Sequence, residues 1–158
     1  MHFKKVNVAS RNIKNTNFVQ FGVITRSSMG VFVNAGTGSS YGTTTESAEC
    51  KAIIWAIQWA ARNKWTHVII ESNNKPAISY LNKVNSTISW EGENTLKTAA
   101  SFFCFFESIS FSLCNSYGNK APMTLLNNSA FCRFPYNFER PPTWLISQLR
   151  KDLLFCNP

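Results

Sequence analysis

Residues 43–75 constrain the fold most, because they predict one amphipathic helix followed directly by one buried strand. Thr43 and Glu46 have the three-residue spacing of a capping box, the pattern with which many helices begin. At about 100° per residue, Glu49 falls in the middle of the apolar side of this helix. The β-branched run at residues 68–70 is typical of a covered strand. These residues therefore predict a helix packed on a sheet, with a carboxylate on the packed side.

Glu49 has two interpretations, because an ionised carboxylate on an apolar helix face is costly unless a partner compensates it. In the first, Glu49 lies near the positive end of the helix and its carboxylate reaches water. In the second, Glu49 belongs to a functional site beside the end of the strand, at residues 71–73. This segment alone favours the first interpretation.

Length and composition predict one globular domain. The most apolar stretch, residues 102–106, is far too short to cross a membrane, so we expect no membrane partner. The N-terminus has no apolar segment behind its basic residues, and the five cysteines are odd in number without a CxxC pair. We therefore expect an intracellular protein with reduced thiols. A zinc site is not expected, because His2 and His67 lack ligand spacing.

Charge points to one class of partner and excludes one class of mechanism. The formal net charge of +8 favours binding of polyanions, nucleic acid first. The basic residues are scattered, so an ordinary basic surface is the alternative. Asp152 is the single aspartate of the chain, which excludes any mechanism that needs a cluster of aspartates.

The order of elements predicts an α/β fold with a mixed five-stranded sheet flanked by helices. Three antiparallel strands come first, with a turn at residues 26–30 in which Gly30 takes a positive φ, and parallel strands follow. Besides residues 43–75, we expect strands at 5–10, 18–25, 31–33 and 109–114, a flexible segment at 36–42, and helices at 75–82, 90–106, 119–133 and 140–149. The fourth strand should pack beside the first. Residues 1–135 would form the domain, and residues 136–158 a C-terminal tail with a short helix.

Four segments resemble motifs of ribonuclease H-like domains, specifically the plant type related to non-LTR retrotransposon reverse transcriptases. Lys5-Val-Asn-Val-Ala9 resembles the K-x-N-x-D first strand, and residues 23–30 resemble the V-(I/L)-R-D-x-x-G hairpin. Residues 48–52 and 68–73 resemble the A-E-x-x-A helix and the V-E-S-D strand, and residues 119–125 the N-x-x-A-D-x-L helix. The C-terminal segment with Asp152 is also similar to the P-P-x-x-L tail. The resemblance covers nearly the whole chain.

The resemblance implies hydrolysis of the RNA strand of an RNA–DNA hybrid by two Mg²⁺ ions about 4 Å apart. Such ions need several carboxylates, because only hard anionic oxygens compensate for the loss of their hydration shell. The family has carboxylates at four places, where this chain has Ala9, Glu49, Asn73 and Met123. Glu71 corresponds to a neighbour of the site and not to a replacement. The resemblance thus implies a degenerate site that does not bind Mg²⁺ tightly, and it favours Glu49 as the remnant of a metal ligand.

Two hypotheses concern nucleic acid. In the first, the chain is a catalytically degenerate domain that binds RNA–DNA hybrid or RNA through Lys75, Asn119 and Lys120, although these residues also suit an ordinary solvated surface. In the second, the chain is an active hybrid ribonuclease that uses Glu49, Glu71 and solvent-held metal.

Two further hypotheses do not involve nucleic acid. The chain could be a protein-binding scaffold that uses exposed aromatic residues such as Trp55 and Trp90, for a partner that the sequence does not identify. Alternatively, it is the product of a decaying retroelement-derived gene without a selected role.

Overall fold

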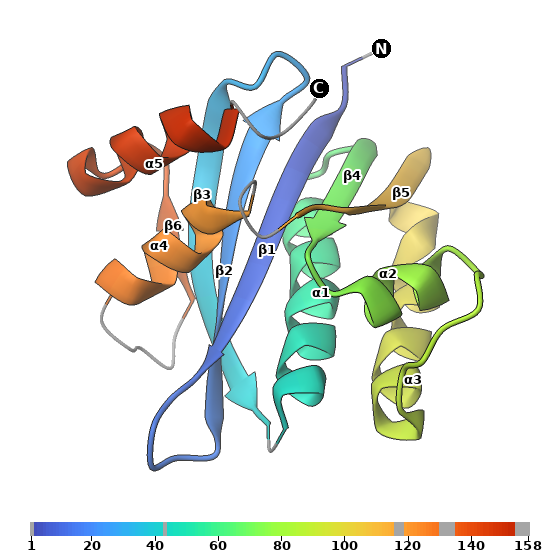
Figure 1. The fold of residues 1–158 in the computed structure, drawn as a ribbon. Helices are drawn as coiled ribbons and strands as arrows, with labels where there is room; N and C mark the ends of the chain where they lie inside the picture. The colour runs from blue at the N-terminus through green and yellow to red at the C-terminus, as the bar shows by residue number, and fades with distance from the viewer. Residues whose placement is uncertain (1, 43, 116–118, 130–134, 154–158) are drawn as a thin grey trace.

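A mixed six-stranded sheet with helices on both faces forms the core of the computed structural model (Figure 1). The structure describes residues 2–42, 44–115, 119–129 and 135–153. The strands are β1 (Lys4–Asn12), β2 (Phe18–Ser27), β3 (Phe32–Tyr41), β4 (His67–Ser72), β5 (Ser108–Leu113) and β6 (Tyr136–Phe138). The helices are α1 (Thr45–Arg62), α2 (Lys75–Leu81), α3 (Trp90–Lys97), the 3-10 helix η1 (Thr98–Phe105), α4 (Lys120–Asn128) and α5 (Thr143–Leu153).

The strand order β5-β4-β1-β2-β3-β6 confirms the expected topology. β1, β2 and β3 form the antiparallel meander, and β4 pairs in parallel with β1 on one side and β5 on the other. The expected count of five strands was one short, because β6 is only three residues long and pairs antiparallel with β3. Gly30 has the expected positive φ, 78°.

Helix α1 begins one turn before Glu49, and its N-cap is Thr44. The side chain of Thr44 accepts a hydrogen bond from the Ser47 N–H at 3.0 Å. The capping residue expected from the sequence, Thr43, lies outside the described residues. The carboxylate of Glu46 accepts the backbone N–H of Ser89 at 3.0 Å and the Ser89 hydroxyl. Glu46 therefore holds the N-terminus of α3, whose N-cap is Ser89.

The expectation of a flexible segment at residues 36–42 was wrong, because β3 continues to Tyr41. The glycines in this strand provide room for two indole rings of α1. A Cβ atom on Gly36 would lie 2.4 Å from the ring of Trp59, and one on Gly38 would lie 2.5 Å from the ring of Trp55. Close packing against the helix, and not flexibility, explains these glycines.

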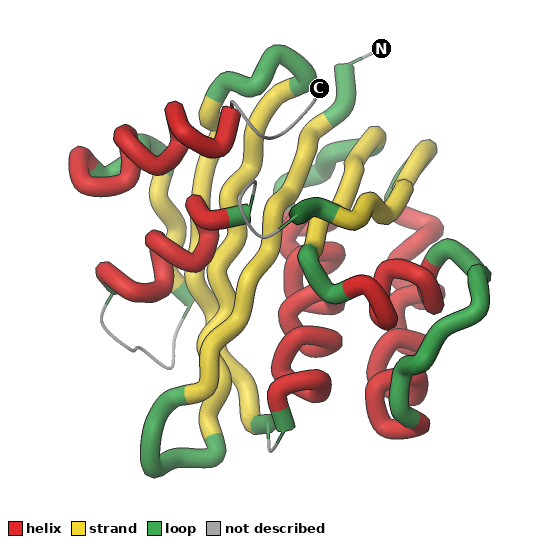
Figure 2. Tube along the Cα trace, viewed as in Figure 1, coloured by secondary structure: helices red, strands yellow, loops and turns green. Residues whose placement is uncertain are grey.

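The sheet lies between two groups of helices (Figure 2). An apolar core fills the space on each side. On the α1 face, Val23 and its neighbours pack against the helix, and the same core includes Val6, Val8, Phe21, Ile53, Ile57 and Ile70. On the opposite face, Ile24 packs with residues of α4 and α5, namely Ala121, Leu125, Leu145 and Leu149. Adjacent strand residues therefore face different layers, as strand periodicity requires.

Two helical segments differ from the sequence expectation. The helix expected at 90–106 is α3 up to Lys97, followed by η1 up to Phe105. The helix expected at 119–133 is α4, which ends at Asn128, and residues 130–134 lie outside the described part. After residue 135, β6 and α5 both pack onto the rest of the fold. None of the described helices is long and apolar enough to span a membrane.

Candidate functional site

A cavity of about 250 Å³ opens where β1, α1, β4 and α4 converge. β1 and β4 are parallel and paired up to Asn7 and Glu71. Ala9 lies two residues after Asn7, and Asn73 lies two residues after Glu71; both line the cavity. Glu49 reaches it from α1, and Met123 from the first turn of α4. The four positions that the sequence predicted to meet are thus side by side.

The residues expected to bind nucleic acid divide into two groups. Asn119 and Lys120 line the cavity at the start of α4. Lys75 is exposed at the first position of α2 and is not among the residues that line the cavity. Of the two aromatic residues proposed for a protein scaffold, Trp90 is 78% exposed, but Trp55 is buried against Gly38. The expectation that Trp55 is exposed was therefore wrong.

Glu49 is half-buried and bonded to a helix cap. The Asn74 side-chain N–H donates to its carboxylate, while the Asn74 side-chain oxygen accepts from the Ala77 N–H at 3.1 Å and caps α2. Burial raises the pKa of the Glu49 carboxyl, the Asn74 hydrogen bond opposes this, and the nearby charge of Glu46 adds to it. In this structure Glu49 therefore links α1 to the N-terminus of α2.

The donor groups in this cavity do not suit a pair of Mg²⁺ ions. Among the described residues that line it, Glu49 supplies the one carboxylate and Lys120 a positive charge. The side chain of Asn73 offers Mg²⁺ a neutral amide oxygen, and the methyl group of Ala9 offers no ligand atom. The thioether of Met123 is a soft ligand that Mg²⁺ does not favour. Within the described part of the chain there is also no group of three or more His, Cys, Asp and Glu side chains that could hold a metal.

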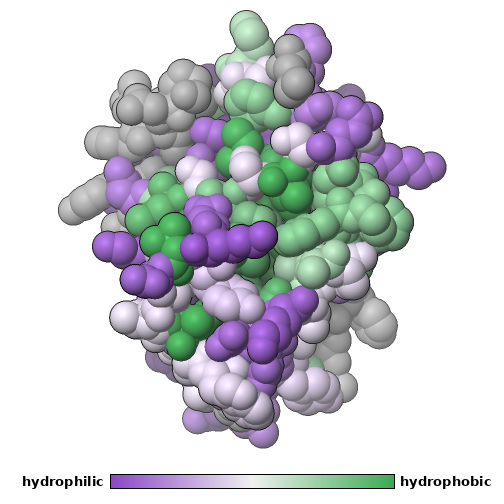
Figure 3. Space-filling view, turned by 90° about the vertical axis from the view of Figure 1, so that its right-hand side faces the viewer, coloured by the Kyte–Doolittle hydropathy of each residue, from purple (hydrophilic) through white to green (hydrophobic). Residues whose placement is uncertain are grey.

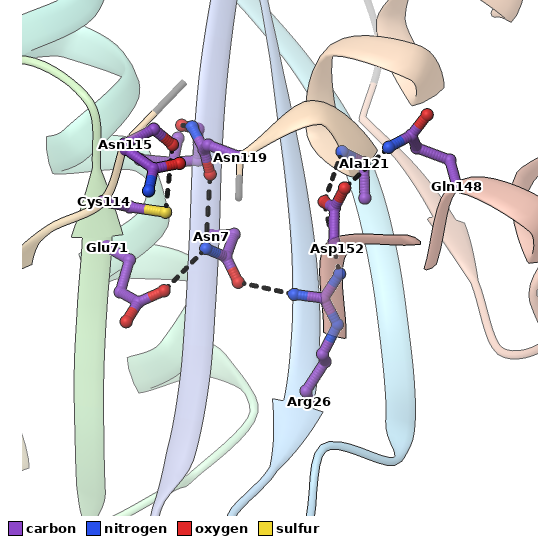
Figure 4. A network of polar contacts seen from close by, with 10 residues as sticks. Asn7, Arg26, Glu71, Cys114, Asn115, Asn119, Ala121, Gln148 and Asp152 are labelled. Carbon is purple, nitrogen blue, oxygen red and sulfur yellow. Dashed lines mark hydrogen bonds and ion pairs between the residues drawn. The ribbon is translucent and has the colours of Figure 1, made fainter. Parts of the chain in front are cut away.

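A buried polar network centred on Asn7 lies beside the cavity (Figure 4). The Asn7 side-chain amide donates to Glu71 at 2.8 Å and to Asn119 at 3.2 Å, and its oxygen accepts from Arg26 at 2.9 Å. Asn119 in turn donates to the backbone oxygen of Val8 at 2.9 Å. The network therefore fixes Asn119, and with it the start of α4, against β1.

Glu71 takes part in this network, and it is not among the residues that line the cavity. Its carboxylate accepts from Asn7 and lies 3.1 Å from the ammonium of Lys5. With 7% of its surface exposed, Glu71 is buried between these partners. This geometry matches the interpretation of Glu71 as a neighbour of the site.

The single aspartate fastens α5 to the wall of the cavity. Asp152 is fully buried, accepts the Ala121 N–H of α4 at 2.7 Å and the Gln148 amide at 2.7 Å, and lies 3.6 Å from the Arg26 guanidinium. Burial raises the pKa of the Asp152 carboxyl, whereas its hydrogen bonds and Arg26 lower it. The Asp152 carboxylate lies at the first turn of α4, where the positive end of the helix dipole stabilises a negative charge.

Sequence reasoning missed this network, although its members occupy quoted motifs. Asn7 stands between two apolar residues of a strand, Arg26 in the hairpin motif, and Asp152 in the tail motif. A polar residue amid covered strand residues is a usable signal, because a buried polar group requires a partner.

The sequence matches the reverse transcriptase-like family over residues 7–129. The chain belongs to this family of ribonuclease H-like domains. A comparison with curated protein sequences gives no match.

Solved structures of similar fold have low sequence identity to the chain. RNase H1 from the halophilic archaeon Halobacterium salinarum NRC-1 has a TM-score of 0.70 at 17% identity, over 80% of this chain and 99% of that one. LC11-RNase H1, solved in complex with an RNA/DNA hybrid, has a TM-score of 0.64 at 14% identity, over 78% and 91%. The N-terminal RNase H domain of a Mycobacterium tuberculosis protein has a TM-score of 0.65 at 11% identity, over 76% and 87%. These likenesses establish the ribonuclease H-like fold.

Proposed function

We propose that this chain is a nucleic-acid-binding ribonuclease H-like domain whose cavity no longer cleaves the RNA strand of an RNA–DNA hybrid. The observation that carries the proposal is the composition of the cavity: its four predicted metal positions meet, and only Glu49 among them is a carboxylate. Mg²⁺ gives up its water reluctantly and requires several hard anionic oxygens. The cavity offers too few of these to hold two such ions in place.

The surroundings of Glu49 support a role other than metal binding. Its carboxylate bonds to Asn74, which caps α2, and burial raises its pKa. Lys120 adds a positive charge to the same cavity. A site with one acid and one base has lost the surplus of negative charge that attracts dications, and it repels the phosphate backbone less.

The proposed ligand is an RNA–DNA hybrid or RNA. The net charge of +8, with Asn119 and Lys120 in the cavity and Lys75 exposed on α2, favours contact with phosphates. The similar fold of LC11-RNase H1, whose structure was solved with an RNA/DNA hybrid, makes a hybrid the first ligand to test. The motif likeness supports an origin in a plant-type domain of a non-LTR retrotransposon.

The test measures hybrid binding and cleavage in the same samples. Fluorescence anisotropy with a labelled hybrid, repeated over a range of salt concentrations, gives affinity and its salt slope, and gel analysis with added Mg²⁺ gives cleavage. We expect salt-sensitive binding without cleavage. Lys75→Ala and Lys120→Ala should each weaken binding and reduce the salt slope by about 1.

Arg62→Ala is the matched control. Arg62 lies thirteen residues after Glu49 on α1, which places it about 20 Å along the helix from the cavity. Its removal takes away one positive charge but should leave the affinity close to that of the parent. No binding near physiological salt, or an equal loss in Arg62→Ala, would contradict a nucleic-acid site at the cavity. Mg²⁺-dependent turnover that disappears in Glu49→Ala would contradict the loss of catalysis.

A further inference from the structure

Strand β5 forms one edge of the sheet, and its own sequence lacks the residues that usually protect such an edge. Its residues, Ser108 to Leu113, read SISFSL, with no charge, no proline and no glycine. Exposed edge strands normally carry lysine, proline or a bulge, because their unpaired backbone groups bind other strands. The strand is thus suited to pair with a further strand.

The backbone groups that point outward follow from the pairing with β4. The N–H of Ser108 donates to Thr66 at 3.0 Å, and that of Cys114 donates to Ser72 at 2.9 Å. Residues with even numbers therefore bond to β4, and those with odd numbers direct their N–H and C=O groups away from the sheet. The exposed side chain of Asn82 donates to the outward oxygen of Phe111 at 3.1 Å, and another strand would have to displace it.

The side chains of β5 alternate between an apolar face and a serine face. Ile109, Phe111 and Leu113 are in register with Val68, Ile70 and Ser72 of β4, and Ile70 is part of the core on the α1 side. Next to this row, the ring of Phe103 lies 6.0 Å from that of Phe111. Phe103 and Leu113 remain 36% and 49% exposed, and Figure 3, which views the molecule from this side, shows a continuous hydrophobic area.

We propose that β5 pairs antiparallel with β5 of a second copy, which joins two sheets across a two-fold axis at Phe111. In this register Phe111 faces Phe111 of the other copy, and Ile109 faces Leu113. All three outward pairs then exchange backbone hydrogen bonds, and apolar side chains meet apolar side chains. A shift by one residue would bring the apolar row against serines. A shift by two toward the N-terminus would place Leu113 opposite the exposed Glu107.

The open apolar surface predicts a dimer of moderate strength. If a whole aromatic or leucine side chain has about 150–250 Å² of surface, the row and Phe103 leave roughly 200 Å² open in each copy. A stable interface buries about 800 Å² per partner, so strand backbone and flanking side chains must supply the rest. We therefore expect the dimer to dissociate on dilution.

Charges introduced on the serine face test both the dimer and its register. In the proposed register Ser110 of one copy lies opposite Ser112 of the other. Ser110→Lys with Ser112→Lys places two like-charged pairs across the axis and should raise the dissociation constant about tenfold or more. Ser110→Glu with Ser112→Lys creates two opposite-charge pairs and should keep the dimer. Sedimentation velocity at rising protein concentration measures the dissociation constants, and circular dichroism checks that each variant is folded.

Each outcome supports or overturns the proposal. A parent that dimerises, a dilysine variant that is monomeric and an opposite-charge variant that dimerises would support it. A parent that stays monomeric at all concentrations would overturn it and leave the edge for another kind of strand. A dilysine variant that dimerises as well as the parent would show that the interface lies elsewhere, which overturns the proposal. Loss of the dimer in both variants would overturn the proposed register.

Discussion

Asp152→Ala removes one partner of the buried ion pair that joins α5 to the sheet. The Arg26 guanidinium, 3% exposed, would then remain buried without its carboxylate, and the N–H of Ala121 would lose its acceptor. Breaking a buried pair in this way costs about 3–5 kcal/mol. A domain of this size is stable by about 5–15 kcal/mol in total, so the variant should lose a large share of its stability.

Urea unfolding followed by tryptophan fluorescence and circular dichroism measures the loss. Lys151→Ala is the control, because Lys151 is the exposed neighbour of Asp152 on the same helix and should change the unfolding free energy by no more than about 0.5 kcal/mol. Replacing both partners, with Arg26→Met and Asp152→Leu, should recover much of the loss, since neither charge of the pair is then left buried without the other. A cost below about 1 kcal/mol for Asp152→Ala would refute the structural role of the pair.

Three further predictions concern single positions. Burial raises the pKa of Glu49 above its usual 4.5, so the protonated carboxyl stabilises the fold below that pH, and this contribution is lost as the pH rises through the folded pKa. Glu49→Gln should therefore flatten this part of a plot of unfolding free energy against pH. An unchanged profile would be evidence against the raised pKa. Gly38→Ala should destabilise the fold by about 1–3 kcal/mol, because its Cβ would overlap the ring of Trp55; an unfolding curve identical to the parent's would disprove that close packing. Burial raises the pKa of Cys50 to about 12, so a thiol reagent at about pH 8 should label Cys104, which is exposed, and spare Cys50 in the folded protein; equal labelling by mass spectrometry would contradict the burial.

Local patterns were enough to predict most of the fold. The alternation of residues 5–8, the turn at Gly30 and the helix-then-strand pattern of residues 43–75 each depend on short-range sequence patterns, and all three elements appear in the structure. β6 was missed because three residues carry too little pattern, and its place depends on pairing with a distant strand. Residues 36–42 were misjudged for the same reason: the indole rings that cover Gly36 and Gly38 come from a different element.

The candidate site was predictable as a set of positions but not as a set of contacts. Ala9, Glu49, Asn73 and Met123 are far apart in sequence and only the resemblance to known motifs united them, yet all four line one cavity. The bond from Asn74 to Glu49 was not foreseen, because it depends on how α2 starts after β4. Nor was the role of Asp152, since two of its partners, Ala121 and Arg26, lie on other elements.

The most direct test of the central claim restores the missing acids. Ala9→Asp, Asn73→Asp and Met123→Asp would be installed together, and cleavage of a labelled RNA–DNA hybrid would be measured with Mg²⁺ in the parent, in the triple variant and in the triple variant with Glu49→Ala. We predict turnover in the triple variant only. Equal Mg²⁺-dependent cleavage by the parent would contradict the loss of catalysis, and a folded triple variant that binds no Mg²⁺ would contradict the assignment of these four positions as a former metal site.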